Sequence, residues 1–365
     1  MEVLKLEIGS IFDIPINNLF LEEKKIIKFP IEEYYKYKEK KFFNTGRSAI
    51  EFLFHYCIPQ KKDEIILVPN YICKSVLDAI QRAGYKYKEY SITPDFDIDL
   101  KDLVEKITNK TKIILFLNYF GTAITENTAN KLQQLKKNGM IIVEDDTQSI
   151  FSKLEGRMGI GNYIIASIRK WLPIPDGAVL YSETEKIPLI QLKSGYNEYS
   201  SLYLIAQLMK SKYIENEQLD KNLFLELTKQ STTALFSDYE IRDMTPIAQK
   251  LLTNINIMLL EESRRKNYKY LYNAFQKVKQ IKTPVRLEAN MVPFGMPILV
   301  DKRDKLLEYL IKNNIYCNVH WKNIIGESTA ESISNRILTI PCDQRYAENE
   351  MKYIVSKINE FYKGE

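Results

Sequence analysis

The sequence predicts an α/β protein whose main part is a mostly parallel sheet flanked by helices. From about residue 44, short runs of β-branched and apolar residues alternate with longer segments of helical periodicity, which is typical of βαβ units. The 365 residues are enough for one large domain and a smaller second one. A hydrophobic fraction of 45%, with only 13 Gly and 13 Pro, excludes a disordered or low-complexity chain.

Five apolar runs are predicted to be the buried strands of this sheet. They cover residues 64–68, 112–117, 140–144, 163–168 and 178–182. Helices are predicted over residues 48–57, 74–84 and 126–139, and the last two end at a glycine, as helices often do. Because parallel strands are joined by crossover helices, these helices should cover both faces of the sheet.

The composition divides the chain into a large domain, residues 1–240, and a small α+β domain, residues 241–365. The large domain is expected to include an N-terminal arm, residues 1–40, and a helical insertion, residues 183–235. In the small domain one long amphipathic helix is predicted over residues 245–279. Strands at 296–300 and 315–321 and helices at 304–314 and 348–362 are predicted to follow it.

Charge and cysteine usage exclude several classes of function. The net charge of +5 is spread along the chain without a basic block, so we expect neither a nucleic-acid nor a membrane partner. No apolar run approaches the roughly 18 residues of a membrane span, and the start of the chain lacks a secretory pattern, which predicts a cytoplasmic protein. Four cysteines without CxxC spacing and two histidines give no basis for a metal site or a disulfide scaffold.

Polar residues follow the predicted strands at the edge where open α/β sheets bind their ligands. Tyr71 to Cys73 follow the first strand, Asn118 the second, Asp145 to Gln148 the third and Ser167 to Lys170 the fourth. Gly46 and Arg47 open a helix whose free N–H groups and positive dipole end would suit a phosphate.

The combination of an acid, a lysine and the anion-binding N-terminus of a helix at one crevice indicates pyridoxal phosphate as the cofactor. Lys170 can hold the aldehyde as a Schiff base, and Asp145 can keep the pyridine nitrogen protonated. A charge partner at roughly 4–6 Å favours the protonated ring by about 1–3 pKa units.

The chain resembles the DegT/DnrJ/EryC1/StrS family of sugar aminotransferases, which belong to the fold type I PLP enzymes. The similarity rests on the motifs TGRSAI, VPNYIC, IIVEDDTQS, SIRKWLPIPDGAVLYS and RILTIPCDQRYAENEM. It implies a seven-stranded, mostly parallel sheet and a homodimer with its sites at the subunit interface. It further implies Lys170 as the aldehyde-binding lysine, Asp145 on the pyridine nitrogen and Gln148 at the phenolic oxygen of the cofactor. Gly46, Arg47 and Ser167 would lie at its phosphate.

Several positions depart from the family pattern. Cys73 stands where an aromatic residue usually stacks on the cofactor ring, and Tyr71, two residues earlier, is the candidate replacement. Asn118 replaces a histidine, and Arg47 replaces a threonine of the phosphate turn. An asparagine that reaches the phosphate of the neighbouring subunit falls near Asp238. Arg47 can offset lost contacts, because a guanidinium forks onto phosphate oxygens.

Each candidate also has an ordinary structural interpretation. Asp145 can cap the segment that follows it, although Asp146 is the better candidate for a cap. The Ser167 hydroxyl can bond to backbone, and Cys73 can be a small buried hydrophobe. His320 can fill the core or face a substrate. Lys170, Gln148 and Gly46 can be a surface lysine, a first-turn glutamine and a helix-start glycine, and residues 156–161 are expected to form a turn rather than a dinucleotide site.

We therefore predict a PLP-dependent aminotransferase that acts on a keto sugar, nucleotide-linked, in surface polysaccharide or amino-sugar biosynthesis. The amino donor would be an amino acid such as glutamate. Lys170 would hold the cofactor and then, as a free amine, transfer the proton. One alternative is a PLP-fold protein that binds without turnover, and another is a PLP enzyme of dehydratase or acyl-transfer type.

Overall fold

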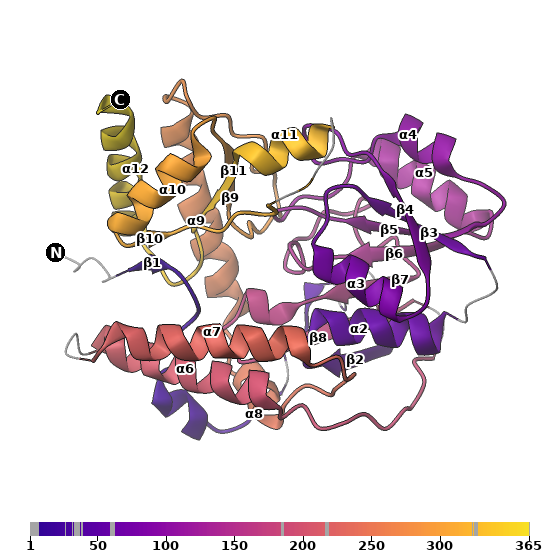
Figure 1. Ribbon diagram of the computed structural model, residues 1–365, viewed down its shortest axis with the longest axis horizontal. Coiled ribbons are helices and arrows are strands. Elements are labelled where there is room, and N and C mark those ends of the chain that lie inside the picture. The colour runs from indigo at the N-terminus through magenta and orange to yellow at the C-terminus, as the bar shows by residue number, and fades with distance from the viewer. Residues whose placement is uncertain are drawn as a thin grey trace.

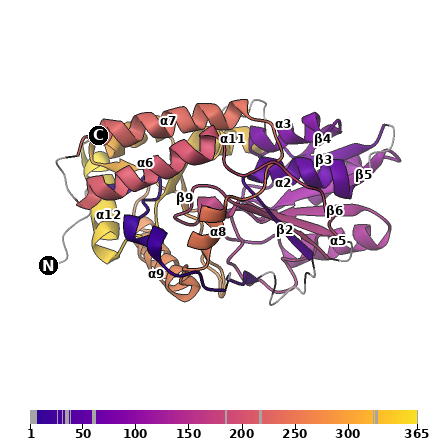
Figure 2. The ribbon, with the colours of Figure 1, turned by 90° about the horizontal axis from the view of Figure 1, so that it is seen from below.

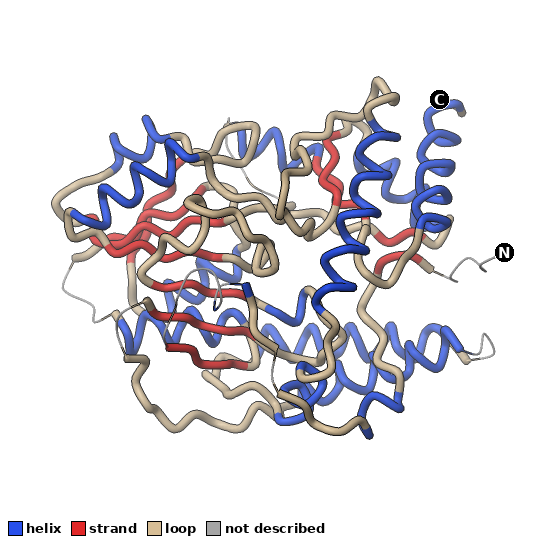
Figure 3. The backbone as a smooth tube through the Cα atoms, turned by 180° about the vertical axis from the view of Figure 1, so that it is seen from behind, coloured by secondary structure: helices blue, strands red, loops and turns tan. Residues whose placement is uncertain are grey.

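The largest sheet of the described chain has seven strands in the order β2-β8-β7-β6-β5-β3-β4. It lies in the half of the molecule away from the two termini (Figure 3). The computed structural model describes residues 7–25, 27–30, 32, 37, 39–58, 63–183, 186–215, 219–322, 324 and 328–364. The strands are β2 (Glu39–Phe43), β3 (Ile65–Pro69), β4 (Lys86–Tyr90), β5 (Thr111–Leu117), β6 (Ile141–Asp145), β7 (Tyr163–Ala166) and β8 (Ala178–Ser182). Strands β3 to β7 are parallel, and β8 is antiparallel to both of its neighbours. The predicted mostly parallel sheet is confirmed.

All five predicted strands are present, within a residue or two at most of their ends. The two strands that the sequence did not predict, β2 and β4, lie at the edges of the sheet. Their sequences, EKKFF and KYKEY, mix charged and aromatic residues. Charged side chains are common on edge strands, where they discourage pairing with other chains, and they conceal the apolar run that marks a buried strand.

Helices cover both faces of the sheet (Figure 1). Helices α2 (Gly46–Phe52) and α3 (Lys74–Arg82) pack on one face, and α4 (Leu100–Lys106) and α5 (Glu126–Lys137) pack on the other. Alternate residues of one strand serve the two faces: Ile66 and Val68 of β3 belong to the cluster with α2 and α3, and Leu67 belongs to the cluster with α4 and α5. The predicted helix over residues 48–57 continues past α2 as a π-helical turn, Leu53–Cys57.

The predicted insertion, residues 183–235, contains the helix pair α6 (Glu198–Glu215) and α7 (Lys221–Ser237), which lie side by side (Figure 2). A buried carboxylate joins this pair to the start of the chain. Glu7 lies 2.6 Å from the amines of both Lys210 and Lys221. Two cations therefore offset the cost of burying this one acid.

The C-terminal part of the chain packs helices around two small sheets. Strands β9 (Met296–Leu299) and β11 (Ile337–Ile340) pair antiparallel, and β10 (Ile315–Tyr316) pairs parallel with the N-terminal strand β1 (Ile8–Gly9). The N-terminal arm, expected with the large domain, thus joins a strand of the C-terminal region. The helices are α8 (Pro246–Leu252), α9 (Ile257–Phe275), α10 (Arg303–Lys312), α11 (Thr329–Arg336) and α12 (Glu348–Lys363). None of the helices described here is both long and apolar enough to cross a bilayer.

Two predictions for this region are wrong. The single helix predicted over residues 245–279 is two helices, α8 and α9, because the Asn256 side chain accepts a hydrogen bond from the Leu259 amide and starts a new helix. The strand predicted over residues 315–321 has only two residues. Beyond it, Asn318 makes a single bridge to Thr339.

The turn after β5 holds the sheet against the segment that leads to β9. Gly121 has φ +97°, and a Cβ there would lie 2.2 Å from the Val292 carbonyl oxygen. The Ser152 hydroxyl joins the same two segments, donating to the Gly121 carbonyl at 2.7 Å and accepting from the Val292 amide at 2.9 Å. Only glycine permits this backbone approach.

We expect Gly121→Ala to lower the free energy of unfolding by about 3 kcal/mol or more, since it adds a backbone clash to an unfavourable φ. Gly139→Ala is the matched control, because Gly139 also has a positive φ, +90°, but has no atom within 4 Å of the added Cβ. It should cost only about 1–2 kcal/mol. Urea unfolding of both variants measures the difference, and equal losses would show that the contact with Val292 is unimportant.

Candidate active site

A cavity of about 200 Å³ lies at the carboxyl ends of β3, β5, β6 and β7. Eight of the nine predicted site residues line it: Gly46, Arg47, Cys73, Asn118, Asp145, Gln148, Ser167 and Lys170. They come from five separate segments, which the parallel order of the strands brings to one edge of the sheet.

Asp145 is the last residue of β6 and is almost fully buried at 6% exposure. Its Oδ1 accepts a hydrogen bond from the Thr147 amide at 2.9 Å. Burial raises the pKa of Asp145, while the Thr147 hydrogen bonds and the charge of Lys170 act in the opposite direction. Asp145, and not Asp146, therefore makes the local backbone contact, and it faces the cavity as well.

Lys170 ends a short 3-10 turn, Ile168–Lys170, directly after β7, and its side chain is open to the cavity. The next residue, Trp171, anchors the turn: it is fully buried, and its indole Nε1 donates to the Thr147 carbonyl at 2.8 Å. Burial lowers the pKa of Lys170, and Arg169 lowers it further, while Cys73 and Asp145 oppose the shift. A lowered pKa increases the fraction of free amine at neutral pH.

Gly46 and Ser167 face each other across one end of the cavity. A Cβ added at Gly46 would lie 3.4 Å from the Ser167 Cβ, so the glycine leaves open the space between them. The Ser167 amide donates to the Thr147 hydroxyl at 3.0 Å, and within the described chain the Ser167 hydroxyl has no hydrogen-bond partner. The Arg47 guanidinium donates to the Leu235 carbonyl of α7, and it lies 5.3 Å from the ring of Phe236.

Gln148 and Asn118 differ in whether their amide N–H groups are hydrogen-bonded within the described chain. Gln148 Oε1 accepts from the Phe120 amide at 2.9 Å, which aims its Nε2 away from that bond, and no described residue accepts from Nε2. Both amide hydrogens of Asn118 are used, because Nδ2 donates to Glu144 at 2.8 Å and to Asp146 at 2.7 Å. Asn118 therefore lines the cavity while its polar atoms support the acids behind it.

Those two acids form a buried layer under the site. Glu144 accepts hydrogen bonds from the amides of Gly159, Ile160 and Gly161 at 2.9–3.0 Å. The predicted turn at residues 156–161 is thus a loop wrapped around one carboxylate. Burial and the charge of Glu144 raise the pKa of Asp146 well above its usual value, which favours its protonated form.

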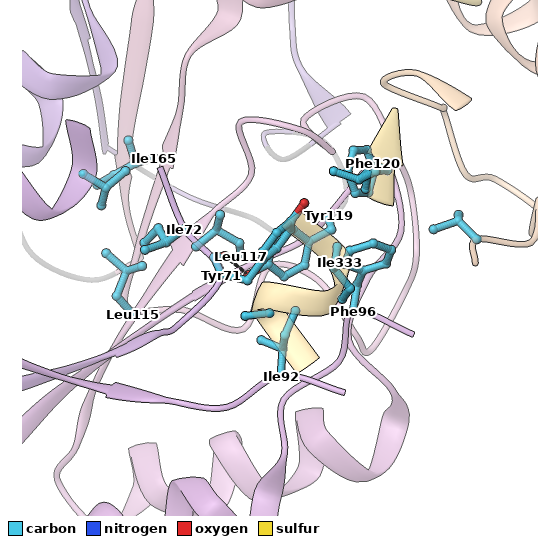
Figure 4. Close-up of a cluster of buried hydrophobic side chains, with 14 of the residues drawn as sticks. Tyr71, Ile72, Ile92, Phe96, Leu115, Leu117, Tyr119, Phe120, Ile165 and Ile333 are labelled. Atoms are coloured by element: carbon cyan, nitrogen blue, oxygen red, sulfur yellow. Dashed lines mark hydrogen bonds between the residues drawn. The ribbon is translucent and has the colours of Figure 1, made fainter. Parts of the chain in front are cut away.

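Tyr71 is the one predicted site residue that does not line the cavity. Its side chain is fully buried, and it lies beside Phe96 and Tyr119 (Figure 4), with ring centroids 5.8 and 5.7 Å away. The ring centroid of Trp321 lies 5.2 Å away. The side chain is directed into this aromatic cluster, so the expectation that it replaces the stacking aromatic is wrong.

Trp321, which the sequence did not single out, lines the cavity together with Cys73. It comes from the segment between β10 and α11, in the C-terminal part of the chain. The only signal in the sequence was an aromatic residue next to His320 in a region predicted to be a strand. No local pattern indicates that this segment folds over the strand ends.

A second cavity, of about 440 Å³, lies beside the first, and Arg169 and Lys170 line both. His320 belongs to this second cavity, and its Nδ1 lies 2.9 Å from the Thr339 hydroxyl. Burial and the neighbouring Lys170 lower the pKa of His320 to about 3, which keeps the ring neutral. His320 therefore faces a cavity, in line with one of its two interpretations, and also packs against Phe294, in line with the other.

Asp238 lies outside both cavities and is the C-terminal cap residue of α7. Burial alone would raise its pKa, but hydrogen bonds from Asn197, the Glu240 amide and Arg242 lower the pKa instead. Its charge is paired with Arg242 at 2.8 Å. Among the residues that the structure describes, no group of three or more His, Cys, Asp or Glu side chains can hold a metal ion.

Asp146→Asn should raise the free energy of unfolding at neutral pH, because asparagine removes the cost of keeping a proton on a carboxyl that is ionised in the unfolded chain. Glu144→Gln should cost about 2 kcal/mol or more, because hydrogen bonds to a charged acceptor are lost. The two variants form a matched pair, to be compared by chemical unfolding.

The raised pKa of Asp146 also predicts how the stability difference between wild type and Asp146→Asn changes with pH. A carboxyl with a raised folded pKa keeps its proton when the unfolded chain has lost it, so wild-type stability falls as pH rises above about 4. Asp146→Asn should remove this contribution, and its stability relative to wild type should rise with pH above that point. A difference between the two proteins that does not change with pH would contradict a protonated Asp146.

Comparison with known proteins identifies the family of the chain. The sequence profile of the DegT/DnrJ/EryC1/StrS aminotransferase family matches residues 28–168 and 247–359. A search of curated proteins finds no match.

Solved structures of low sequence identity share the fold. PseC of Helicobacter pylori, an aminotransferase involved in the biosynthesis of pseudoaminic acid, is 15% identical with a TM-score of 0.70, and the match covers 98% of this chain and 100% of that chain. Spr1654 of Streptococcus pneumoniae in its PLP form is 14% identical with a TM-score of 0.68, over 96% and 97% of the two chains. DesV of S. venezuelae, solved with a ketimine intermediate, is 15% identical with a TM-score of 0.64, over 92% and 90%. The predicted fold type I architecture is confirmed.

Proposed function

The chain belongs to the DegT/DnrJ/EryC1/StrS aminotransferase family of PLP-dependent enzymes, and on this premise we propose that it transfers an amino group from an amino acid to a nucleotide-linked keto sugar. The observation that carries the proposal is that Lys170 and Asp145 line one cavity and interact electrostatically. An amine and a carboxylate at adjacent strand ends are the pair that this cofactor requires.

The residues present fit pyridoxal phosphate. Three features of the cavity are left for a ligand: the Ser167 hydroxyl, the Nε2 donor of Gln148 and the space above Gly46. Gly46, Arg47 and Ser167 would hold the phosphate, Gln148 would donate to the phenolic oxygen, and Asp145 would accept from the pyridine nitrogen. When bound, the cofactor supplies an electron sink and a carrier for the amino group.

Lys170 is the proposed catalytic base. Its lowered pKa increases the fraction of free amine, so its Nζ can accept a proton from the substrate carbon and return it. The buried indole of Trp171 keeps the Lys170 turn in place while this happens. A proton shuttle requires such a fixed position, since its efficiency depends on reach and orientation.

Asp145 is the proposed charge partner of the ring nitrogen. Burial raises the pKa of its carboxyl, and a cation beside it favours the ionised form. The Thr147 amide holds the carboxylate in place. Asn118 donates its amide hydrogens to Glu144 and Asp146, and it would hold these two acids in position behind the cavity.

Trp321 is proposed as the aromatic that covers the ring. Cys73 is too small to stack, and Trp321 lines the same cavity. An aromatic residue over the ring supports a catalytically active enzyme and not the alternative, a PLP-fold protein that binds without turnover. We further propose that the protein is a cytoplasmic homodimer that acts in surface polysaccharide or amino-sugar biosynthesis.

The central test is the attachment of the cofactor. Purified protein with added PLP should develop a visible absorbance band, and borohydride should fix the cofactor onto Lys170, as located by peptide mass spectrometry. Lys170→Ala should lose both the band and the label, and its amino-transfer rate should fall by about a hundredfold or more. Lys137→Ala, on the exposed end of α5, is the control. A label that persists in Lys170→Ala would remove the assignment.

A second test concerns Trp321. Trp321→Ala should weaken PLP binding about tenfold, through lost stacking and apolar contact, whereas Trp321→Phe should retain most of the affinity. An absorbance titration of each variant measures the dissociation constant. Equal affinities for wild type and Trp321→Ala would show that the ring is covered by another group.

A further inference from the structure

Arg169 is a charged residue to which the proposed function assigns no role. It precedes Lys170 and lines both cavities. Its side chain is half-buried, and its Nε is fully buried without a hydrogen-bond partner in the described chain. No hydrogen bond or ion pair within the described residues engages the rest of its guanidinium. Because a guanidinium is always charged and carries five N–H donors, Arg169 is available to an anion in the cavities.

The acid that interacts electrostatically with Arg169 is Asp176, and its oxygens are engaged elsewhere. Its Oδ1 accepts from the Thr245 amide at 3.0 Å, and its Oδ2 accepts from the Thr245 hydroxyl at 2.5 Å. Burial raises the pKa of Asp176 to about 6. Asp176 thus caps the start of α8 and forms no ion pair with Arg169 among the described residues.

Two tyrosine rings of α6 hold the Arg169 guanidinium without using its N–H groups. The guanidinium lies 5.6 Å from the ring centroid of Tyr199 and 6.0 Å from that of Tyr203. The two rings stack on each other at 5.9 Å, and the Tyr199 hydroxyl donates to the Pro175 carbonyl at 2.9 Å. A cation over an aromatic face is attracted by the ring electrons. The guanidinium is therefore held in position while its donors stay available.

Arg169 lies near the end of the first cavity where Gly46 and Ser167 face each other. It follows Ser167 by two residues, and both line this cavity. Burial lowers the pKa of Arg47, and the charges of Arg82 and Arg169 lower it further, so the guanidiniums of Arg47 and Arg169 are near neighbours. Two guanidiniums, the unpartnered Ser167 hydroxyl and the space above Gly46 thus gather in one place.

The charge balance of the first cavity favours a doubly charged anion. Asp145 is the only acid among the described residues that line it, and in the proposed function Asp145 faces the pyridine nitrogen. Arg47 and Arg169 are both permanently charged, and they repel each other unless an anion lies between them. A phosphate monoester carries about −1.5 to −2 charges at pH 7 and offers three acceptor oxygens, so it can neutralise both.

We propose that Arg169 binds the cofactor phosphate together with Arg47, and that these two guanidiniums keep the amine form of the cofactor in the cavity. The inference rests on the proposed function. In its aldehyde form the cofactor is attached covalently to Lys170, but the amine form has no carbonyl with which this lysine can react. Its retention depends on noncovalent contacts, of which charge-assisted hydrogen bonds to the phosphate are the strongest.

The test compares two compounds that differ only in the phosphate, pyridoxamine 5′-phosphate and pyridoxamine. Each is titrated calorimetrically into the full-length protein freed of PLP, and the ratio of the two affinities is the phosphate preference. Arg169→Gln should lower the phosphate preference about tenfold or more, because hydrogen bonds between two charged groups are lost. Arg169→Lys keeps the charge but not the planar fork, so it should lower the preference less.

Arg303→Gln is the matched control. Arg303 is also a buried arginine, but its guanidinium is engaged within the chain, by Asp304 at 2.6 Å and by the Ser334 carbonyl at 3.1 Å. It lines neither cavity. Arg303→Gln should lower thermal stability and leave the phosphate preference unchanged. If Arg169→Gln does not fold, the comparison of Arg169→Lys with Arg303→Lys decides.

An unchanged phosphate preference in the Arg169 variants would overturn the proposal, as would an equal loss of affinity for both compounds. Uridine diphosphate is titrated as the other source of phosphate. Weaker binding of uridine diphosphate by Arg169→Gln, with the affinity for pyridoxamine 5′-phosphate unchanged, would assign Arg169 to the substrate and also overturn the proposal.

The two proposals fail separately, because pyridoxamine 5′-phosphate binds without reacting at Lys170. Borohydride labelling of Lys170 together with an unchanged phosphate preference in Arg169→Gln removes only the role of Arg169. A phosphate preference that depends on Arg169, without labelling of Lys170, removes the aminotransferase proposal and leaves the phosphate site.

Discussion

The site depends on the parallel pairing of β6 with its two neighbours. In this register Leu117 of β5 lies opposite Asp145, and Asp145 lies opposite Ile165 of β7. The ends of the three strands therefore come together at one edge of the sheet, and the residues that follow them enter one cavity. A shift of the β6 register by one residue would turn Asp145 to the other face and expose the apolar residues of the strand. The hydrophobic pattern that stabilises the sheet thus also positions the acid opposite the lysine.

The layer under the cavity shows how the fold accommodates buried acids. Three consecutive acids lie at the end of β6, and each has a different environment: Glu144 is bound by backbone amides, Asp145 faces the cavity, and Asp146 has a strongly raised pKa. The loop at residues 159–161 supplies the amides, so it stabilises a carboxylate that lies behind the cavity. Asn118 links Glu144 and Asp146, which explains why an amide suits this position.

The two cavities meet at Lys170, which gives the lysine access to both. Residues of the sheet edge line the first cavity, whereas the second is lined largely by the N-terminal arm and the C-terminal region, including Gly9, His320, Arg264 and Arg345. Trp321 reaches from the C-terminal region into the first cavity. The aromatic cluster of Tyr71, Tyr119 and Phe96 supports Trp321 from below, so Tyr71 acts on the site through packing and not by direct contact.

The sequence alone determined the five inner strands of the sheet and the residues that follow them, because buried strands leave apolar runs. It could not place Trp321 or Arg264, since neither carries a local signal: one was an aromatic in a predicted strand and the other a charge on an amphipathic helix. It misplaced Tyr71, whose neighbours in space lie dozens of residues away. Only the tertiary structure decided which side chains cover the cavity, because Cys73 and Trp321 reach it from segments separated by more than a hundred residues.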